Sequence, residues 1–206
     1  MHLPVLAYIG HALLNYTLTN PGGSITPRGT GYYDIFGAGV LTFHPASVLT
    51  LPAPNPAYIP ETGPLNISLP AYKVDILSGN DYFKLRSGNM FELDTTAAGK
   101  AVNSGALVHF RAGGFIRINA YLGQILQGKG DRDMKFGETD FWEPITIDTS
   151  DPELAWLNFR MIISQGRILV DKATGKAYGF ELRLFSPVSP TEIKKRYARE
   201  DVGLIQ

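Results

Sequence analysis

The sequence has 206 residues, of which 44% are hydrophobic, 18% charged and 11% aromatic, and this composition excludes a largely disordered chain. Nineteen basic residues balance nineteen acidic ones, so no net charge attracts the chain to nucleic acid or to an anionic membrane. The chain has no cysteine, which excludes disulfides, thiolate nucleophiles and cysteine-ligated metal sites.

The predicted elements are short strands. The 22 glycines and 14 prolines separate β-branched and aromatic runs, which is the pattern of an antiparallel sandwich or barrel. The N-terminus is apolar but lacks a basic region, so it predicts a first strand and not a signal peptide. The predicted strands cover residues 4–18, 32–43, 71–77, 81–86, 89–95, 105–112, 115–121, 141–148, 155–164, 167–171 and 177–186.

Residues 44–70 interrupt this series of strands. They hold seven of the fourteen prolines and one charged residue, Glu61. Because proline removes the donors of a strand ladder, the segment is not a central strand. Its apolar content favours a lid over a cavity, and a packed insertion or a subunit contact is the alternative.

Two helical segments complete the prediction. Residues 121–130 could form one or two helical turns that end at Gly128. The C-terminal helix, 189–200, has Ser189 as its cap, Pro190 in its first position and Glu192 in a capping box. No apolar run reaches about 18 residues, so we expect no membrane span, and we expect a cytoplasmic protein.

Three segments resemble a known family: NDYFKLRSGNMFELD (80–94), SGALVHFRAGGFIRI (104–118) and DFWEPITIDTSDPELAWLNFRMIISQGR (140–167). Their order and spacing are similar to those of the domain of unknown function 3237, also called UPF0311, over roughly residues 75–186. The resemblance implies an all-β fold: one closed antiparallel β-barrel over residues 1–206, similar in plan to the allene oxide cyclase and dirigent barrels. It implies no activity. The long 44–70 segment and Asn103-Ser104-Gly105 depart from the family pattern, which would fit a specialised substrate.

The motifs of several enzyme classes are missing from the sequence. There is no glycine-rich phosphate loop, no GxGxxG that opens a helix and no Gly-x-Ser-x-Gly elbow. The four histidines lack metal-ligand spacing. We therefore expect no cofactor and no metal, and acid–base chemistry remains as the simplest catalytic mode.

Strand alternation sorts the remaining polar residues into faces. On each of the strands 105–112, 115–121 and 155–164, one face is apolar and the other carries polar and aromatic side chains. The polar faces hold His109 and Arg111, Arg117 and Tyr121, and Trp156, Asn158 and Arg160.

Two interpretations of these faces stay open. Either the apolar faces fill the barrel and the polar faces meet water, or a wide barrel holds a ligand and its lumen is lined by the polar faces. We favour the second slightly, since a tryptophan is rarely placed on a solvated strand face. In that case Asp81 or His109 is the general base, Arg111 or Arg160 stabilises an enolate, and Asn158 orients it.

The substrate-binding wall would consist of Tyr82, Arg117, Tyr121, Phe141, Trp142 and Trp156. For Asp81 and Trp156 a structural role, as a turn cap and as a core residue, is the alternative. Our first hypothesis is a cofactor-independent cyclase or isomerase that acts on a small apolar substrate, such as a polyketide-like or terpenoid-like intermediate. The alternatives are a non-catalytic binding barrel and a structural protein that forms oligomers, and a homodimer is one assembly that we consider.

Overall fold

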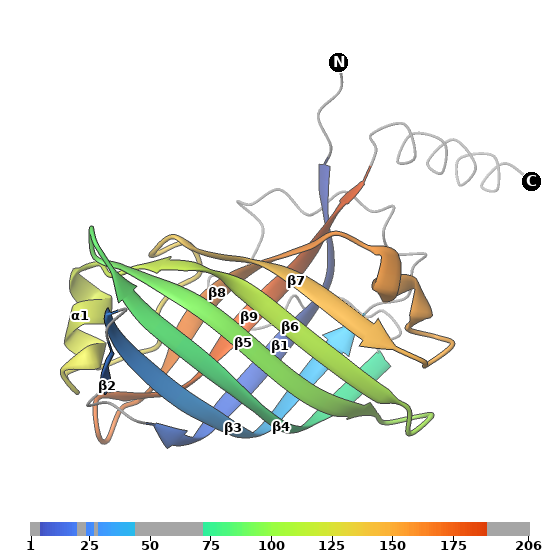
Figure 1. Cartoon of the computed structure of the whole chain (residues 1–206), viewed down its shortest axis with the longest axis horizontal. Coiled ribbons are helices and arrows are strands. Elements are labelled where there is room, and N and C mark those ends of the chain that lie inside the picture. Colours follow the sequence, from blue (N-terminus) through green and yellow to red (C-terminus); the bar gives the residue numbers. More distant parts are fainter. Residues whose placement is uncertain (1–4, 20–23, 27–28, 44–71, 189–206) are drawn as a thin grey trace, which may run out of the picture.

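The computed structural model describes residues 5–19, 24–26, 29–43 and 72–188. In these residues nine antiparallel strands form one sheet, and eight of them close into a barrel because β1 pairs with both β3 and β9 (Figure 1). The predicted closed β-barrel is therefore confirmed. The short β2 adds to β3 alone. The strands are β1 (Val5–Thr19), β2 (Ser24–Thr26), β3 (Gly29–Phe43), β4 (Tyr72–Arg86), β5 (Met90–Ala101), β6 (Leu107–Arg117), β7 (Phe141–Thr149), β8 (Ile162–Asp171) and β9 (Lys176–Val188).

Several neighbouring predicted strands are joined in the structure, and the end of 155–164 is continuous with 167–171 in β8. Residues 71–77 and 81–86 belong to β4, which has a register shift between Ile76 and Ser78. Residues 105–112 and most of 115–121 belong to β6, which continues through Gly113 and Gly114. The glycines in these strands suggested turns. In the structure, however, Gly79 in β4 and Gly114 in β6 lie so close to the neighbouring strand that a side chain would not fit. A Cβ at Gly79 would lie 2.6 Å from the Thr96 carbonyl oxygen, and one at Gly114 would lie 2.4 Å from that of Trp142.

The prediction of a strand over residues 155–164 is wrong for the first half of that range. Residues Ala155–Phe159 form a 3-10 helix, η3, and β8 begins only at Ile162. Asp151 starts the turn that leads into η3, because its carboxylate accepts hydrogen bonds from the backbone N–H groups of Glu153 and Leu154.

The helical turns predicted at residues 121–130 are confirmed. The helix α1 (Ala120–Leu126) begins after Asn119, whose side chain accepts a hydrogen bond from Leu122 N, and Gly128 follows its end with a φ of +69°. The helices α1 and η3 lie at opposite ends of the barrel (Figure 1). None of the helices in the described part of the chain is long and apolar enough to cross a membrane. The predicted lid, 44–70, and the C-terminal helix, 189–200, lie outside the described residues.

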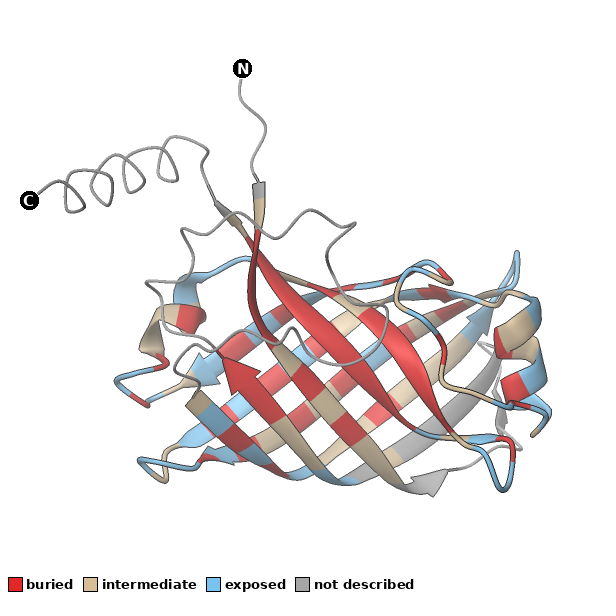
Figure 2. Cartoon of the chain, turned by 180° about the vertical axis from the view of Figure 1, so that it is seen from behind, coloured by how far each residue is buried: buried red, intermediate tan, exposed pale blue. Residues whose placement is uncertain are grey.

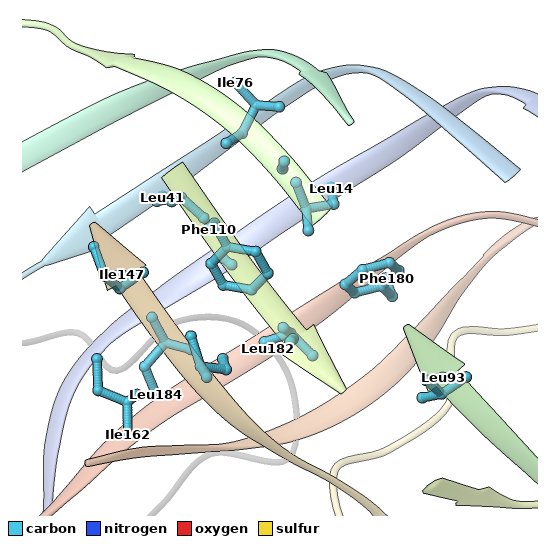
Figure 3. Close-up of a cluster of buried hydrophobic side chains, with 14 of the residues drawn as sticks. Leu14, Leu41, Ile76, Leu93, Phe110, Ile147, Ile162, Phe180, Leu182 and Leu184 are labelled. Carbon is cyan, nitrogen blue, oxygen red and sulfur yellow. The ribbon is translucent and has the colours of Figure 1, made fainter. Parts of the chain in front are cut away.

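The core fills the interior of the barrel. On β5, β6 and β7 buried and exposed residues alternate, and the buried faces carry mostly apolar side chains. Figure 3 shows Phe110, Phe180, Leu182 and Leu184 converging from opposite walls. On β9, in contrast, residues 179–186 are buried without interruption, and Figure 2 shows this strand red along most of its length. The outer face of β9 is thus also covered.

Candidate functional site

Most of the polar residues predicted to line the lumen lie on the outside of the barrel. On β6 the buried face carries Val108, Phe110, Ala112 and Ile116, whereas His109, Arg111 and Arg117 are exposed. Arg111 Nη2 lies 3.9 Å from Asp94 Oδ1, and Arg117 Nε donates to Asp140 Oδ2 at 2.8 Å. The prediction that the polar faces point inward is therefore wrong for β6. The apolar face lies inside because its burial removes more apolar surface from contact with water than burial of the polar face would.

Trp142 and Tyr82 also differ from their predicted positions in the lumen. Trp142 is 41% exposed and pairs across strands with Phe115 on the outer face of β6 and β7. Tyr82 is half-buried and alternates with Asp81, so it points to the opposite side of β4.

Tyr121 anchors the segment that follows α1. Its hydroxyl oxygen donates to Arg132 O at 2.6 Å and accepts from Arg132 N at 2.9 Å, and the Arg132 guanidinium lies 4.1 Å from the centroid of its ring. Arg132 in turn forms two hydrogen bonds with the carboxylate of Glu138. The tyrosine therefore holds this segment in place and does not contribute a wall to the lumen.

The three residues predicted on the strand 155–164 have local roles at η3. Arg160 is exposed and follows the last turn of η3. Trp156 packs against the core, and its buried Nε1 has no hydrogen-bond partner among the described residues. Asn158 binds both polar backbone groups of Thr149: its Oδ1 accepts from Thr149 N at 2.9 Å, and its Nδ2 donates to Thr149 O at 2.8 Å.

These contacts predict that Asn158→Ala lowers stability. Asn158→Ala removes two hydrogen bonds at the end of β7, and each is expected to contribute about 1 kcal/mol to the free energy of unfolding. We expect a thermal midpoint lower by several degrees, measured by circular dichroism, because about 1 kcal/mol corresponds to about 2–4 °C in a chain of this size. Asn103→Ala, in the exposed turn after β5, is the control. An unchanged midpoint for Asn158→Ala would contradict the structural role.

Asp81 and Phe141 do point into the barrel. Asp81 is 2% exposed, and Thr95, its cross-strand partner on β5, donates a hydrogen bond from Oγ1 to Asp81 Oδ1 at 2.7 Å. A hydroxyl donor at this oxygen stabilises negative charge on it. Phe141 is buried, and its ring lies over Gly166, where a Cβ would approach the ring carbons to 2.4 Å.

Glu143 is the residue that sequence reasoning missed. It alternates with Phe141, Ile145 and Ile147 on the buried face of β7 and is 1% exposed. Neither carboxyl oxygen has a hydrogen-bond partner among the described residues. Burial raises the pKa of the Glu143 carboxyl well above its ordinary value, and the charge of Asp81 raises it further. A charged residue type on an otherwise apolar face was the signal in the sequence.

The two buried carboxyl groups lie on the same inner face of the barrel, separated by small residues. The cross-strand pairs run from Asp81 to Thr95, from Thr95 to Ala112, and from Ala112 to Ile145, which is two residues from Glu143. Beside Ala112 on the same face, Gly114 lies against Glu143, since a Cβ there would approach Glu143 Cγ to 3.0 Å. The inner face between β4 and β7 therefore carries the small residues Thr95, Ala112 and Gly114.

This arrangement resembles the acid–base pairs of enzymes that keep one carboxyl neutral and a neighbour ionised. A neutral Glu143 can donate a proton, and an ionised Asp81 can accept one. Within the described residues, no group of three or more histidine, aspartate or glutamate side chains has an arrangement that could hold a metal ion.

Comparisons with known proteins agree with the fold. The sequence profile of the family described as "Protein of unknown function (DUF3237)" matches residues 52–182. Over 171 residues the chain is 27% identical to PR-toxin biosynthesis cluster protein 7 of Penicillium roqueforti, which covers 82% of this chain and 86% of that protein.

Solved bacterial structures share the barrel at low sequence identity. A conserved protein of unknown function from Rhodopseudomonas palustris matches with a TM-score of 0.65 and 12% identity, over 91% of this chain and 100% of that one. A protein with unknown function from Clostridium acetobutylicum matches with a TM-score of 0.61 and 12% identity, over 91% and 99%. A beta-barrel like protein from Acinetobacter baumannii matches with a TM-score of 0.55 and 17% identity, over 89% and 95%. At these identities the likeness shows the fold alone.

Proposed function

Because the chain belongs to the DUF3237 family, whose description assigns no reaction, we propose a function from its own residues. We propose a cofactor-independent isomerase or cyclase that acts on a small, largely apolar intermediate, with Asp81 as the base and Glu143 as the acid. The observation that carries the proposal is the buried Glu143 carboxyl, which lacks a partner among the described residues and is electrostatically coupled to Asp81.

A buried polar group without a hydrogen-bond partner lowers the stability of the fold, so a functional role would explain why Glu143 is present. Perturbed carboxyl groups on the inside of a fold are typical of sites that bind or transform a ligand. The relative in Penicillium roqueforti bears the name of a toxin biosynthesis cluster, which supports a role of this chain in natural-product biosynthesis. The enzymatic step itself is our proposal.

A non-catalytic binding barrel is the second candidate. It is favoured by the apolar character of the inward faces, where leucine, isoleucine and phenylalanine side chains dominate. A homodimer and a cytoplasmic location are also part of the proposal. The exposed Phe115 and Trp142, which are neighbours on β6 and β7, would support the homodimer, and light scattering would measure it.

The experiment that tests the enzyme compares Asp81→Asn with Asp94→Asn. The two aspartates lie on adjacent strands, but Asp81 is buried in the lumen and Asp94 is exposed outside. We would delete the gene in its host, isolate the metabolite that accumulates, and incubate it with the purified full chain without added cofactor. We expect conversion to a product of equal mass, and a loss of about 10²–10⁴-fold in rate for Asp81→Asn but not for Asp94→Asn.

The outcomes separate the candidate functions. Conversion at equal rates by both variants would contradict the role of Asp81. A product of different mass would contradict isomerisation. Tight binding of the metabolite with no conversion by the wild-type chain would favour the binding barrel.

A further inference from the structure

A buried serine lies directly beside Glu143 on the inner wall of the barrel. Ser164, on β8, is the cross-strand partner of Glu143, and the two residues are 0% and 1% exposed. Buried and less buried positions alternate on β8 from Ile162 to Gly166, so Ser164 points inward together with the core residue Ile162. The Cβ atoms of directly opposite residues are about 4.5–5.5 Å apart, which places the Ser164 hydroxyl next to the Glu143 side chain.

The hydrogen bond of the Ser164 hydroxyl is long. Ser164 Oγ donates to the backbone carbonyl oxygen of Glu143 at 3.3 Å. Hydrogen bonds between two oxygen atoms usually measure about 2.5–3.0 Å, so a ligand oxygen that comes closer would replace this acceptor. The hydroxyl is therefore available as a donor to a bound molecule.

The Glu143 carboxyl supplies a second donor at the same place. Burial raises its pKa, so the group keeps its proton, and neither of its oxygens has a hydrogen-bond partner among the described residues. One O–H group of Glu143 and one of Ser164 thus stand side by side on adjacent strands. An acceptor with two lone pairs, such as a carbonyl oxygen, can bind both of them.

Two donors aimed at one carbonyl oxygen stabilise the negative charge that this oxygen gains when a neighbouring C–H bond breaks. Some enzymes keep a buried carboxylic acid neutral for this purpose and use an ionised aspartate as the base. The sequence suggested Arg111 or Arg160 as the stabilising group, but both are exposed. Glu143 and Ser164 supply the same function from inside the barrel.

We infer that Glu143 and Ser164 together bind the carbonyl oxygen of a ketone or aldehyde, and that Asp81 moves a proton between two carbon atoms of this substrate. The inference rests on the proposed function and narrows its substrate to an enolisable carbonyl compound. Asp81 lies on the same inner face beyond Thr95 and Ala112. The carbon skeleton between the carbonyl group and the reacting carbon would lie over these small residues.

The steps balance for a β,γ-unsaturated ketone. The C–H bond between the carbonyl group and the double bond breaks, its proton goes to the Asp81 carboxylate, and its electron pair forms a new C–C π bond. The carbonyl π electrons take the proton of the Glu143 O–H group, which gives a dienol. The proton on Asp81 then goes to the far carbon of the diene, and the dienol proton returns to Glu143. The product is the conjugated ketone, an isomer of the substrate, so no oxidant or reductant is needed.

The site carries the same total charge at every step. Asp81 holds one negative charge at the start, Glu143 holds it when the dienol has formed, and Asp81 holds it again at the end. Because a second buried charge never forms, the reaction avoids the desolvation cost that a new charge would bring. The pairing of one neutral and one ionised carboxyl group suits this exchange.

The test measures enolisation of 2-decalone by the full chain. In deuterium oxide the hydrogens next to its carbonyl group exchange for deuterium each time that the enol forms, and proton nuclear magnetic resonance follows the loss of their signal. We expect the wild-type chain to accelerate the exchange. Ser164→Ala should slow it by about 10²-fold, as expected for the loss of one donor to the oxygen. Ser186→Ala, at an equally buried serine on β9, is the matched control and should keep the wild-type rate.

The infrared spectrum of the bound ketone distinguishes a donor from a structural residue. Each hydrogen bond to a carbonyl oxygen weakens the C=O bond and lowers its stretching frequency. We expect the frequency of bound 2-decalone to rise in Ser164→Ala and to stay unchanged in Ser186→Ala. Decalin, which has the same skeleton without the oxygen, should bind equally to the wild type and to Ser164→Ala.

Three outcomes would overturn the inference: no accelerated exchange by the wild type, an unchanged rate and stretching frequency in Ser164→Ala, or an equal loss of rate in Ser186→Ala. The metabolite experiment is independent of them. If the accumulated metabolite is isomerised but 2-decalone does not exchange, the proposed function stands and the inference about the carbonyl oxygen is wrong.

Discussion

Glu143→Gln is expected to abolish turnover and at the same time to make the protein more stable at neutral and alkaline pH. Glutamine has nearly the same shape as a protonated glutamate but cannot give up a proton. If Glu143 is the acid, the rate should fall by about 10²–10⁴-fold. A variant that loses activity and gains stability would separate a functional carboxyl from a structural one, because natural sites often retain destabilising groups for function.

The stability gain follows from the raised pKa of Glu143. In the unfolded chain this carboxyl ionises near its ordinary pKa of 4.5, whereas burial and the charge of Asp81 keep it protonated in the folded chain. Between the two pKa values the folded state binds more protons, so the free energy of unfolding decreases as pH rises. The loss is about 1.4 kcal/mol for every unit by which the folded pKa exceeds the unfolded one. Glutamine removes this dependence.

Thermal unfolding from about pH 5 to about pH 8 would measure the effect. The difference in midpoint between Glu143→Gln and the wild type should grow with pH, by about 2–4 °C for each 1 kcal/mol. Asp148→Asn, on the exposed face of the same strand, is the matched control and should show no such trend. A Glu143→Gln variant that melts below the wild type at about pH 8 would contradict a neutral, unpartnered carboxyl, and full turnover would contradict catalysis.

The barrel was predictable because its sequence signals are local. In the last hairpin the turn at 171–176 requires a left-handed residue, and Gly175 has a φ of +68°. The predicted strand 177–186 after this turn corresponds to β9, and the predicted strand 167–171 before it is the second half of β8. Two strand boundaries were predicted wrongly because glycines were taken as turns. Gly79 and Gly114 instead allow the close approach of neighbouring strands and side chains.

The site was harder to predict because alternation defines two faces but does not say which one is inside. Polar residues on β6 looked suited to a ligand, yet an interior packed by phenylalanine and leucine contributes more to stability than a polar one. Asp81 was recognised as a base candidate by its residue type and position. Glu143 was overlooked because it stands between apolar residues, where a charge is unexpected. The turn at Asp151-Pro152, which converts a predicted strand into η3, could have been read from its turn residues.

Glu181→Gln is expected to produce the largest loss of stability among the variants considered. On the covered outer face of β8 and β9, Arg167 donates to Glu181 Oε2 from Nε at 2.8 Å and from Nη2 at 2.5 Å, and both side chains are less than 10% exposed. Arg183 lies beside them, with its guanidinium 3.8 Å from the centroid of the Phe136 ring. Burial lowers the pKa of Arg183, and the charge of Glu181 opposes this effect.

Glutamine would leave the buried Arg167 guanidinium without the carboxylate that accepts its two hydrogen bonds. Removing one member of a buried ion pair costs about 3–5 kcal/mol, so the thermal midpoint should fall by about 10 °C. The matched control is Glu92→Gln, which breaks a similar pair with Arg86 that is about 40% exposed and is therefore expected to cost less than about 1 kcal/mol.

A second variant distinguishes the buried charge from the loss of contacts. Replacing both Arg167 and Glu181 by methionine removes one charge of each sign and keeps apolar volume, and it should recover part of the stability that Glu181→Gln loses, because desolvation of the pair no longer opposes folding. If Glu181→Gln melts no lower than Glu92→Gln, the pair does not stabilise the barrel wall. If the double variant melts lower than Glu181→Gln, the pair contributes more than it costs to bury, and the geometry of its two hydrogen bonds outweighs the desolvation penalty.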